Sequence, residues 1–332
     1  MDSRRLFSIE LGKKTNLIKT DILDKFVEGG QMELIHRRND GKYLKTVYKI
    51  IKGSEMYIFK SISCSPDDDE GKRNLMKEYE ISLNSSRLTE GVVKPLNNKS
   101  MIAKEIGDFI MEIIYEYPGK DILSLIGRKE PENIMKYMIS VALTMKELEK
   151  NNINYYNLKP ENIVIKDEKV KIIDFDMSTS FESKTGLHKT TVVNDNTELY
   201  SPPEVINNKK DCPIKIDVFC WGMTLYQLIT NKSIENLKDE FKLRKENHQQ
   251  FLEQIKSIKI PGNRDLTWKA KEILLFVLNE EYKERPTFTE LCELLQDDRK
   301  IKELEGRRIL MEIVARSIVF NRSWKRGTSL SN

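Results

Sequence analysis

The residues best able to carry out chemistry lie in two short segments near the middle of the chain. The first, Tyr155–Asn162, reads Tyr-Tyr-Asn-Leu-Lys-Pro-Glu-Asn, and Asp174-Phe175-Asp176 begins twelve positions after its end. Together they supply a lysine, two asparagine amides and carboxylates. Carboxylate and amide oxygens are ligands that Mg²⁺ accepts, and a lysine ammonium commonly binds phosphate. Such residues can hold charged ligands, and the ligands they would hold here follow from the family that the two segments resemble.

The two segments resemble the catalytic loop and the metal-binding turn of protein kinases, whose usual letters are HRDLKPEN and DFG. The resemblance implies that Lys159 screens the transferred phosphoryl group and that Asn162 and Asp174 hold Mg²⁺. Asn157 stands where the family has the aspartate that accepts the proton of the substrate hydroxyl. Because an amide has no basic lone pair, we expect the general base to be missing.

Two further departures from the family pattern surround that asparagine. Asp176 replaces the glycine of DFG, which adds a Cβ atom and a charge and reduces the freedom of the turn. Tyr155 and Tyr156 replace His and Arg, so the arginine that usually receives an activation-loop phosphate is absent. We expect metal binding to survive and phosphate-driven ordering through that arginine to be lost.

The segment before this region reads as a sheet built from hairpins. Gln31–Arg38, Lys45–Lys52 and Met56–Ile62 are rich in Ile, Val, Tyr and Phe, as strands are. The turn Asn39-Asp40-Gly41-Lys42 has one glycine where kinases have a G-x-G-x-x-G phosphate cover. Lys60 matches the strand lysine of the V-A-I-K motif, which implies a role in holding the nucleotide phosphates.

The helix expected at Asp68–Leu88 has to supply the glutamate that pairs with this lysine. Glu80 is favoured because it lies near the apolar stripe and thirteen residues before Val93, which is the family interval to the next strand. Glu78 is the alternative. The apolar stripe consists of Leu75, Met76, Tyr79 and Leu83.

Two more strands are expected at Ser100–Glu105 and Asp108–Tyr117. Ile114–Gly119 resembles the hinge that joins the two lobes of a kinase, where the adenine of ATP binds. The resemblance makes Tyr115 a bulky gatekeeper and places Glu116 in the nucleotide site. A structural aromatic residue in a core strand is an equal interpretation of Tyr115.

The remainder of the chain reads as mainly helical. A short helix is expected at Asp121–Arg128 and a long one at Pro131–Lys150, and Ile163–Lys166 and Val170–Ile173 form a small hairpin. Asn196–Glu204 resembles the end of a kinase activation segment.

The family implies two fixed contacts in this helical region. Glu204 should form an ion pair with a distant cation, for which we expect Arg285 of Arg285-Pro286-Thr287. Asp217, in a segment resembling D-V-W-S-x-G, should tie down the backbone of the catalytic loop.

The resemblance therefore implies an α+β fold with two lobes, as in protein kinases. We expect an N-terminal extension at 1–30, a β-rich lobe at 31–117, a helical lobe at 118–298 and a C-terminal helical and basic extension at 299–332. The N-terminal extension reads as a short helix and the C-terminal one as a helix at Arg299–Val319. Each either packs on the body or binds a partner.

Composition narrows the possible functions. The 332 residues carry 56 Lys and Arg and 52 Asp and Glu, interspersed to give a net charge of +4, which disfavours dedicated nucleic-acid binding. The sequence has neither a run of 18 apolar residues nor an apolar leader, so we expect a cytoplasmic protein without a transmembrane segment. The four cysteines lack zinc-site spacing.

The function predicted from these observations is that of a pseudokinase. Such a protein has the kinase fold, binds ATP and Mg²⁺ weakly and acts through one or more protein partners. The alternative is an active Ser/Thr kinase that tolerates the missing base, since phosphoryl transfer depends mostly on positioning and charge stabilisation. Lys60, Lys159, Asn162 and Asp174 keep this alternative open.

Overall fold

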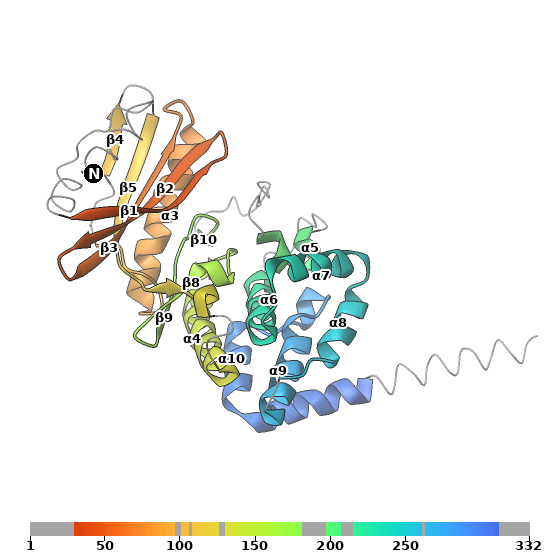
Figure 1. Ribbon diagram of the computed structural model, residues 1–332. Coiled ribbons are helices and arrows are strands. Elements are labelled where there is room, and N and C mark those ends of the chain that lie inside the picture. The colour runs from red at the N-terminus through yellow and green to blue at the C-terminus, as the bar shows by residue number, and fades with distance from the viewer. Residues whose placement is uncertain are drawn as a thin grey trace, which may run out of the picture. The chain divides into compact units, whose positions relative to one another are not determined.

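The computed structural model describes residues 30–96, 101–105, 108–125, 130–180, 197–206, 215–260 and 263–311. They fall into two compact units (Figure 1). The first unit is formed by residues 30–125 and 147–180, and the second by residues 130–146 and 197–311. The first carries the main sheet and the second is helical, so the α+β class is confirmed. The expected helix before residue 30 lies outside the described residues.

The units divide the chain differently from the lobes expected at 31–117 and 118–298. Residues 147–180 were expected in the helical lobe but cluster with the first unit. One reason is a backbone connection, because Val92 pairs with Ile172 as a parallel bridge and the Val93 amide donates to the Ile172 carbonyl at 3.1 Å. The two chemical segments and Lys60 therefore belong to one compact unit.

The first unit contains a five-stranded antiparallel sheet in the order β1-β2-β3-β5-β4. Its strands are β1 (Gln31–Asn39), β2 (Tyr43–Lys52), β3 (Glu55–Cys64), β4 (Met101–Glu105) and β5 (Asp108–Glu116). The β2–β3 hairpin turns at Gly53, whose φ of 61° favours glycine. This turn pairs Val47 with Lys60 and Lys45 with Ile62. Since alternate residues of a strand share a face, Lys45 and Lys60 are diagonal neighbours on one face of the sheet.

Helix α3 (Asp69–Leu88) covers this sheet (Figure 1). Asp68 caps it by accepting a hydrogen bond from the Gly71 amide at 2.8 Å. Leu75 and Tyr79 pack against the apolar core of the sheet. The strand residues of this core are Ile62, Cys64, Met111 and Ile113.

Short elements complete the first unit around the chemical segments. A three-stranded sheet has the order β6-β8-β9, and β7 pairs with β10. The bounds are β6 (Lys120–Asp121), η1 (Ile122–Leu125), β7 (Ile153–Asn154), η2 (Pro160–Asn162), β8 (Ile163–Lys166), β9 (Lys169–Ile172) and β10 (Thr179–Ser180). Strands β8 and β9 form the expected hairpin, which turns through Asp167 and Glu168 with φ of 50° and 61°.

The second unit consists of helices around α6 (Ile216–Thr230), which is buried along nearly its whole length. The others are η3 (Thr197–Tyr200), α5 (Pro203–Ile206), α7 (Ile234–Glu246), α8 (His248–Lys256), α9 (Arg264–Val277), η4 (Tyr282–Glu284), α10 (Phe288–Gln296) and a helix at residues 298–311. Helix α4 (Pro131–Lys150) belongs to this unit up to residue 146. Trp221 of α6 donates its indole N–H to the Met138 carbonyl at 2.9 Å. A Cβ atom at Gly222 would lie 2.5 Å from Val277, so this helix contact requires glycine. Within the described residues, no helix has the length and apolar character needed to cross a membrane.

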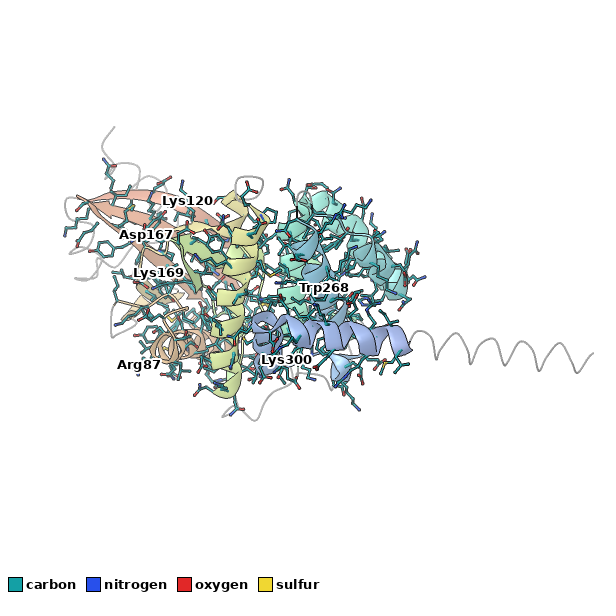
Figure 2. All side chains as sticks on the ribbon, turned by 90° about the horizontal axis from the view of Figure 1, so that it is seen from below. Arg87, Lys120, Asp167, Lys169, Trp268 and Lys300 are labelled. Atoms are coloured by element: carbon teal, nitrogen blue, oxygen red, sulfur yellow. The ribbon has the colours of Figure 1, made fainter. Side chains whose placement is uncertain are left out.

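The helix at residues 298–311 packs back on α9, as one of the two interpretations predicted. Trp268 of α9 donates its indole N–H to the side chain of Glu305 at 3.0 Å. Glu305 lies on the same helix as Lys300, and Figure 2 shows Trp268 next to this helix. Arg308 forms two hydrogen bonds with Glu272, at 3.0 and 2.8 Å. The expected continuation to Val319 lies outside the described residues.

Two buried arginines hold the segment 197–206 in the second unit. Arg285 forms the expected pair with Glu204, a bidentate contact of 2.6 and 2.8 Å, and both side chains are almost fully buried. Arg244 was not predicted from the sequence; it donates to the carbonyls of Leu199 and Ser201. Burial lowers the pKa of Arg244 to about 10. Both guanidinium groups lie over the ring of Phe219.

The Glu204–Arg285 pair should contribute strongly to stability. Arg285→Ala leaves the Glu204 carboxylate buried without its bidentate partner, which we expect to cost about 3–5 kcal/mol in the free energy of unfolding. The matched control is Arg299→Ala, which removes an exposed partner of Asp297 and should leave that free energy unchanged. Urea unfolding of the three proteins measures both effects, and equal stability of the Arg285 and Arg299 variants would contradict the prediction.

Candidate active site

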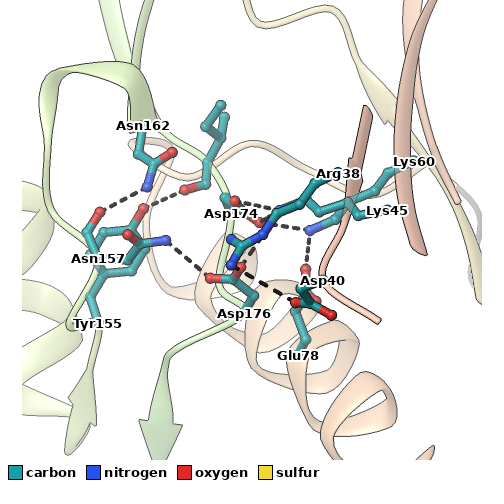
Figure 3. A network of polar contacts seen from close by, with 11 residues as sticks. Arg38, Asp40, Lys45, Lys60, Glu78, Tyr155, Asn157, Asn162, Asp174 and Asp176 are labelled. Carbon is teal, nitrogen blue, oxygen red and sulfur yellow. Dashed lines mark hydrogen bonds and ion pairs between the residues drawn. The ribbon is translucent and has the colours of Figure 1, made fainter. Parts of the chain in front are cut away.

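The centre of the site is the carboxylate of Asp174, which two lysines of the sheet contact (Figure 3). Lys45 of β2 donates to both its oxygens, at 2.8 Å to Oδ1 and 2.6 Å to Oδ2. Lys60 of β3 donates to Oδ1 at 2.7 Å. Lys45 Nζ also lies 3.6 Å from Asp176 Oδ2. The Lys45 ammonium therefore bridges the two carboxylates that flank Phe175.

The helical partner of Lys60 is Glu78, which corrects the prediction of Glu80. Lys60 Nζ donates to Glu78 Oε1, and both side chains are buried, whereas Glu80 is exposed. The buried stripe of α3 consists of Gly71, Leu75, Glu78, Ser82 and Ser85, together with Tyr79 and Ile81 beside it. Glu78 follows Leu75 by one helical turn on this stripe. The apolar pattern pointed elsewhere because three members of the stripe are polar.

The protonation of the three groups follows from burial and their mutual contacts. Burial acts to lower the pKa of Lys60, but the carboxylates of Asp174 and Glu78 outweigh it and hold that pKa well above its usual value. Burial acts to raise the pKa of Asp174, but Lys45 and Lys60 outweigh it and hold that pKa far below its usual value. Burial raises the pKa of Glu78, an effect that the Lys60 ammonium opposes. Asp174 is therefore an anion held by two cations.

The backbone is strained on both sides of the site. Tyr156 and Asp174 have φ of 62° and 67°, in the left-handed region that side-chain-bearing residues seldom adopt. Tyr155 fixes this geometry, because its hydroxyl donates to the Ile173 carbonyl and its ring meets Phe175 edge-on at 5.1 Å. The Ser178 hydroxyl donates to the Tyr155 carbonyl at 3.1 Å. These contacts hold the segment Tyr155–Asn162 against the segment Asp174-Phe175-Asp176.

Two departures from the family pattern form one contact. Asn157 Nδ2 donates to Asp176 Oδ1 at 3.0 Å (Figure 3). The Asn157 side chain is buried, and among the described residues its Oδ1 has no hydrogen-bond partner. An aspartate at position 157 would face the Asp176 carboxylate at this distance, and like charges so close disfavour ionisation of both. The amide at 157 is therefore matched to the carboxylate at 176.

The other two predicted residues of the catalytic segment lie at η2. Asn162 is buried and donates to the Asn157 carbonyl at 2.8 Å, which closes the loop between them. Lys159 is half-buried and immediately precedes the first residue of η2. Lys159 has further contacts, so its assignment to a phosphate stays a prediction.

The predicted hinge residues occupy the end of β5. Tyr115 packs against the core under α3, and burial raises the pKa of its hydroxyl. Glu116 accepts a hydrogen bond from Lys171 of β9, and its amide donates to the Lys94 carbonyl at 3.3 Å. Contact of either residue with a nucleotide stays a prediction. Asp217 is buried in the first turn of α6, in the second unit, and its contact with the catalytic segment likewise stays a prediction.

The oxygens near Asp174 are of the kind that Mg²⁺ accepts, but they are engaged. Both oxygens of Asp174 accept hydrogen bonds from ammonium groups, and Asp176 Oδ1 accepts one from Asn157. Within the part of the chain that the structure describes, no three His, Cys, Asp or Glu side chains gather as a metal site. Magnesium at Asp174 would have to displace Lys45. As these side chains lie, both Asp174 oxygens accept hydrogen bonds from ammonium groups, so binding of Mg²⁺ at Asn162 and Asp174 stays a prediction.

Lys45 was missed in the sequence, where a lysine in a strand is most often solvated. The strand register could have revealed Lys45. A two-residue turn at Gly53-Ser54 pairs Val47 with Lys60, and Lys45 lies two positions from Val47, on the same face of β2.

The correction at α3 is testable. Glu78→Gln removes a buried, charged hydrogen-bond acceptor of Lys60, so the free energy of unfolding should fall by about 1.5–3 kcal/mol. Glu80→Gln is the matched control on the same helix and should be almost neutral, because Glu80 is exposed. Urea unfolding compares the two variants, and a larger loss for Glu80→Gln would restore the original prediction.

Comparison with known proteins places this geometry in a family. The family model described as "Protein kinase domain" matches residues 40–295. A probable serine/threonine-protein kinase PLK of Dictyostelium discoideum is 25% identical over 73% of this chain, which spans 24% of that protein. A probable cell division protein kinase of Encephalitozoon cuniculi is 23% identical over 68% of the chain and 86% of its own length. Since the family model covers more than half of the sequence, the chain belongs to the protein kinase family.

Proposed function

We propose that this protein is a pseudokinase, which binds a nucleotide weakly and acts by binding one or more protein partners. The observation that carries the proposal is the Asn157–Asp176 hydrogen bond. At the position of the general base, the chain presents an amide whose N–H group donates to a carboxylate. The Asn157 Oδ1 atom can accept a hydrogen bond from a hydroxyl, but it cannot take its proton at neutral pH.

The remaining contacts of the site also support a non-catalytic role. Asp174 is held by Lys45 and Lys60, so the carboxylate that kinases turn towards a metal is committed to the protein itself. Asp176 in place of glycine is fixed from two sides, by Asn157 and by Lys45. The network stabilises one conformation of this turn, which suits a protein that presents a constant surface.

The second unit retains the supports of a folded binding module. Arg285 and Arg244 fix the segment 197–206 through contacts with the Glu204 side chain and with backbone carbonyls. Such a module keeps its surface whether or not phosphoryl transfer occurs. We propose that its partners are proteins rather than nucleic acids, because acidic and basic residues are nearly balanced in the sequence, and that it acts in the cytoplasm.

An active Ser/Thr protein kinase is the second candidate. It is favoured by the intact Lys60–Glu78 pair and by the names of the relatives, several of which are serine/threonine-protein kinases. Phosphoryl transfer depends mainly on positioning and electrostatic stabilisation, which a missing base does not abolish.

Phosphotransfer from labelled ATP separates the two candidates. We expect the parent protein and Asp174→Ala to give the same background signal with generic substrates. Asn157→Asp should add little, because the new carboxylate faces Asp176. Asn157→Asp combined with Asp176→Gly should gain far less than the roughly 10²–10⁴ that a positioned base supplies, because Lys45 still engages Asp174.

Turnover by the parent that Asp174→Ala abolishes would establish the active kinase and overturn the pseudokinase proposal. Circular dichroism of every variant verifies that a protein without phosphotransfer activity is folded.

A further inference from the structure

The feature that the proposed function leaves unexplained is the lysine at position 45. Its ammonium contacts both oxygens of Asp174 at 2.6 and 2.8 Å and lies 3.6 Å from Asp176 (Figure 3). Its side chain is mostly buried, so this is not a solvated surface lysine. A single positive centre between two carboxylates occupies the kind of position that a divalent cation takes between acidic ligands.

The sheet holds this lysine in place. The register of the β2–β3 hairpin puts Lys45 and Lys60 on one face as diagonal neighbours, which long side chains can bridge. Both then converge on Asp174 Oδ1, at 2.8 and 2.7 Å. Lys60 is fixed further by Glu78. The ammonium groups of Lys45 and Lys60 therefore lie close together, and their positive charges combine at this site.

Each ammonium retains the capacity to donate to a ligand. An ammonium group has three N–H donors. Lys45 directs its contacts to the two oxygens of Asp174, and Lys60 directs its contacts to Asp174 and Glu78. Asp176 Oδ2 lies 3.6 Å from Lys45, which is beyond hydrogen-bond distance. Among the described residues, this count leaves one donor on each lysine for charge-assisted hydrogen bonds to phosphate oxygens.

A divalent cation at Asp174 competes with this arrangement. It would have to displace the Lys45 ammonium or lie beside it, and two like charges a few ångströms apart in a largely buried site repel strongly. An ammonium group in this position can link an aspartate to an anionic ligand, as a metal does elsewhere, without any ion from solution.

We propose that Lys45 takes the place of the divalent cation, so that this site binds the phosphates of a nucleoside triphosphate without Mg²⁺. The proposal rests on the proposed function, since it concerns the nucleotide that the pseudokinase binds. Lys45 and Lys60 contact the phosphates, and Asp174 orients both ammonium groups instead of ligating a metal.

The test compares ATP binding in EDTA with ATP binding in excess MgCl₂, by isothermal titration calorimetry on the full chain. The parent should bind ATP in EDTA with the same affinity as in MgCl₂. Lys45→Met should weaken binding in EDTA by about ten- to a hundredfold, the loss expected for one charged hydrogen bond. Because this variant frees Asp174 Oδ2, while Lys60 still donates to Oδ1, MgCl₂ should then restore part of the affinity.

Matched variants separate this effect from a general loss of charge or fold. Lys52→Met removes an exposed lysine at the end of β2, on the opposite face of the strand from Lys45, and should bind ATP like the parent. Lys45→Arg keeps the cation and should retain binding in EDTA.

Three results would overturn the proposal: ATP binding by the parent that requires Mg²⁺, equal binding by the parent and Lys45→Met in EDTA, or no ATP binding under either condition. The phosphotransfer assay is independent of the first two results, so the pseudokinase proposal can stand when either of them overturns this one. The third result, no ATP binding under either condition, would also remove weak nucleotide binding from the proposed function and leave only its lack of phosphotransfer.

Discussion

The structure of the first unit depends on one electrostatic constraint, the half-buried carboxylate of Asp174 between the ammonium groups of Lys45 and Lys60. A buried charge is costly unless it is paired, and removing one partner leaves the other without compensation. The constraint joins strands β2 and β3 of the sheet to a turn more than a hundred residues later in the chain. Glu78 adds α3 to the same network.

The departures from the family pattern make sense as one coupled set. Asp176 brings a negative charge to a turn where kinases have glycine, and Lys45 brings a positive charge within 3.6 Å of it. Asn157 replaces a carboxylate that would repel Asp176 and instead donates a hydrogen bond to it. The site therefore lacks a group that can abstract a proton, and has in its place charged side chains that contact one another.

Much of this could be predicted from the sequence. The β-hairpins, α3, α4 and the β8–β9 hairpin follow from alternation, helical spacing and turn residues, and they lie where expected. The pair of Glu204 and Arg285 followed from motif order alone. Such features depend on local patterns or on long motifs with fixed spacing.

The rest depended on three-dimensional packing that a linear pattern does not display. Glu78 was passed over for Glu80 because the buried stripe of α3 contains glycine and serines, which hydrophobicity does not mark. Lys45 was missed because a lysine in a strand is usually solvated. Arg244 was missed because an arginine in a helix rich in charged residues, such as α7, is usually solvated as well. Residues 147–180 belong to the first unit because Ile172 pairs with Val92. No sequence motif predicts this pairing.

A double-mutant cycle on Lys45 and Asp174 tests the central claim most directly. The free energy of unfolding is measured for the parent, Lys45→Met, Asp174→Asn and the double variant, at neutral pH and without metal or nucleotide. If the ion pair organises the site, the two changes are coupled by at least about 1 kcal/mol, within the range found for contacting residues. Additivity within about 0.3–0.5 kcal/mol, as for independent sites, would show that Lys45 does not hold Asp174 and would contradict the account.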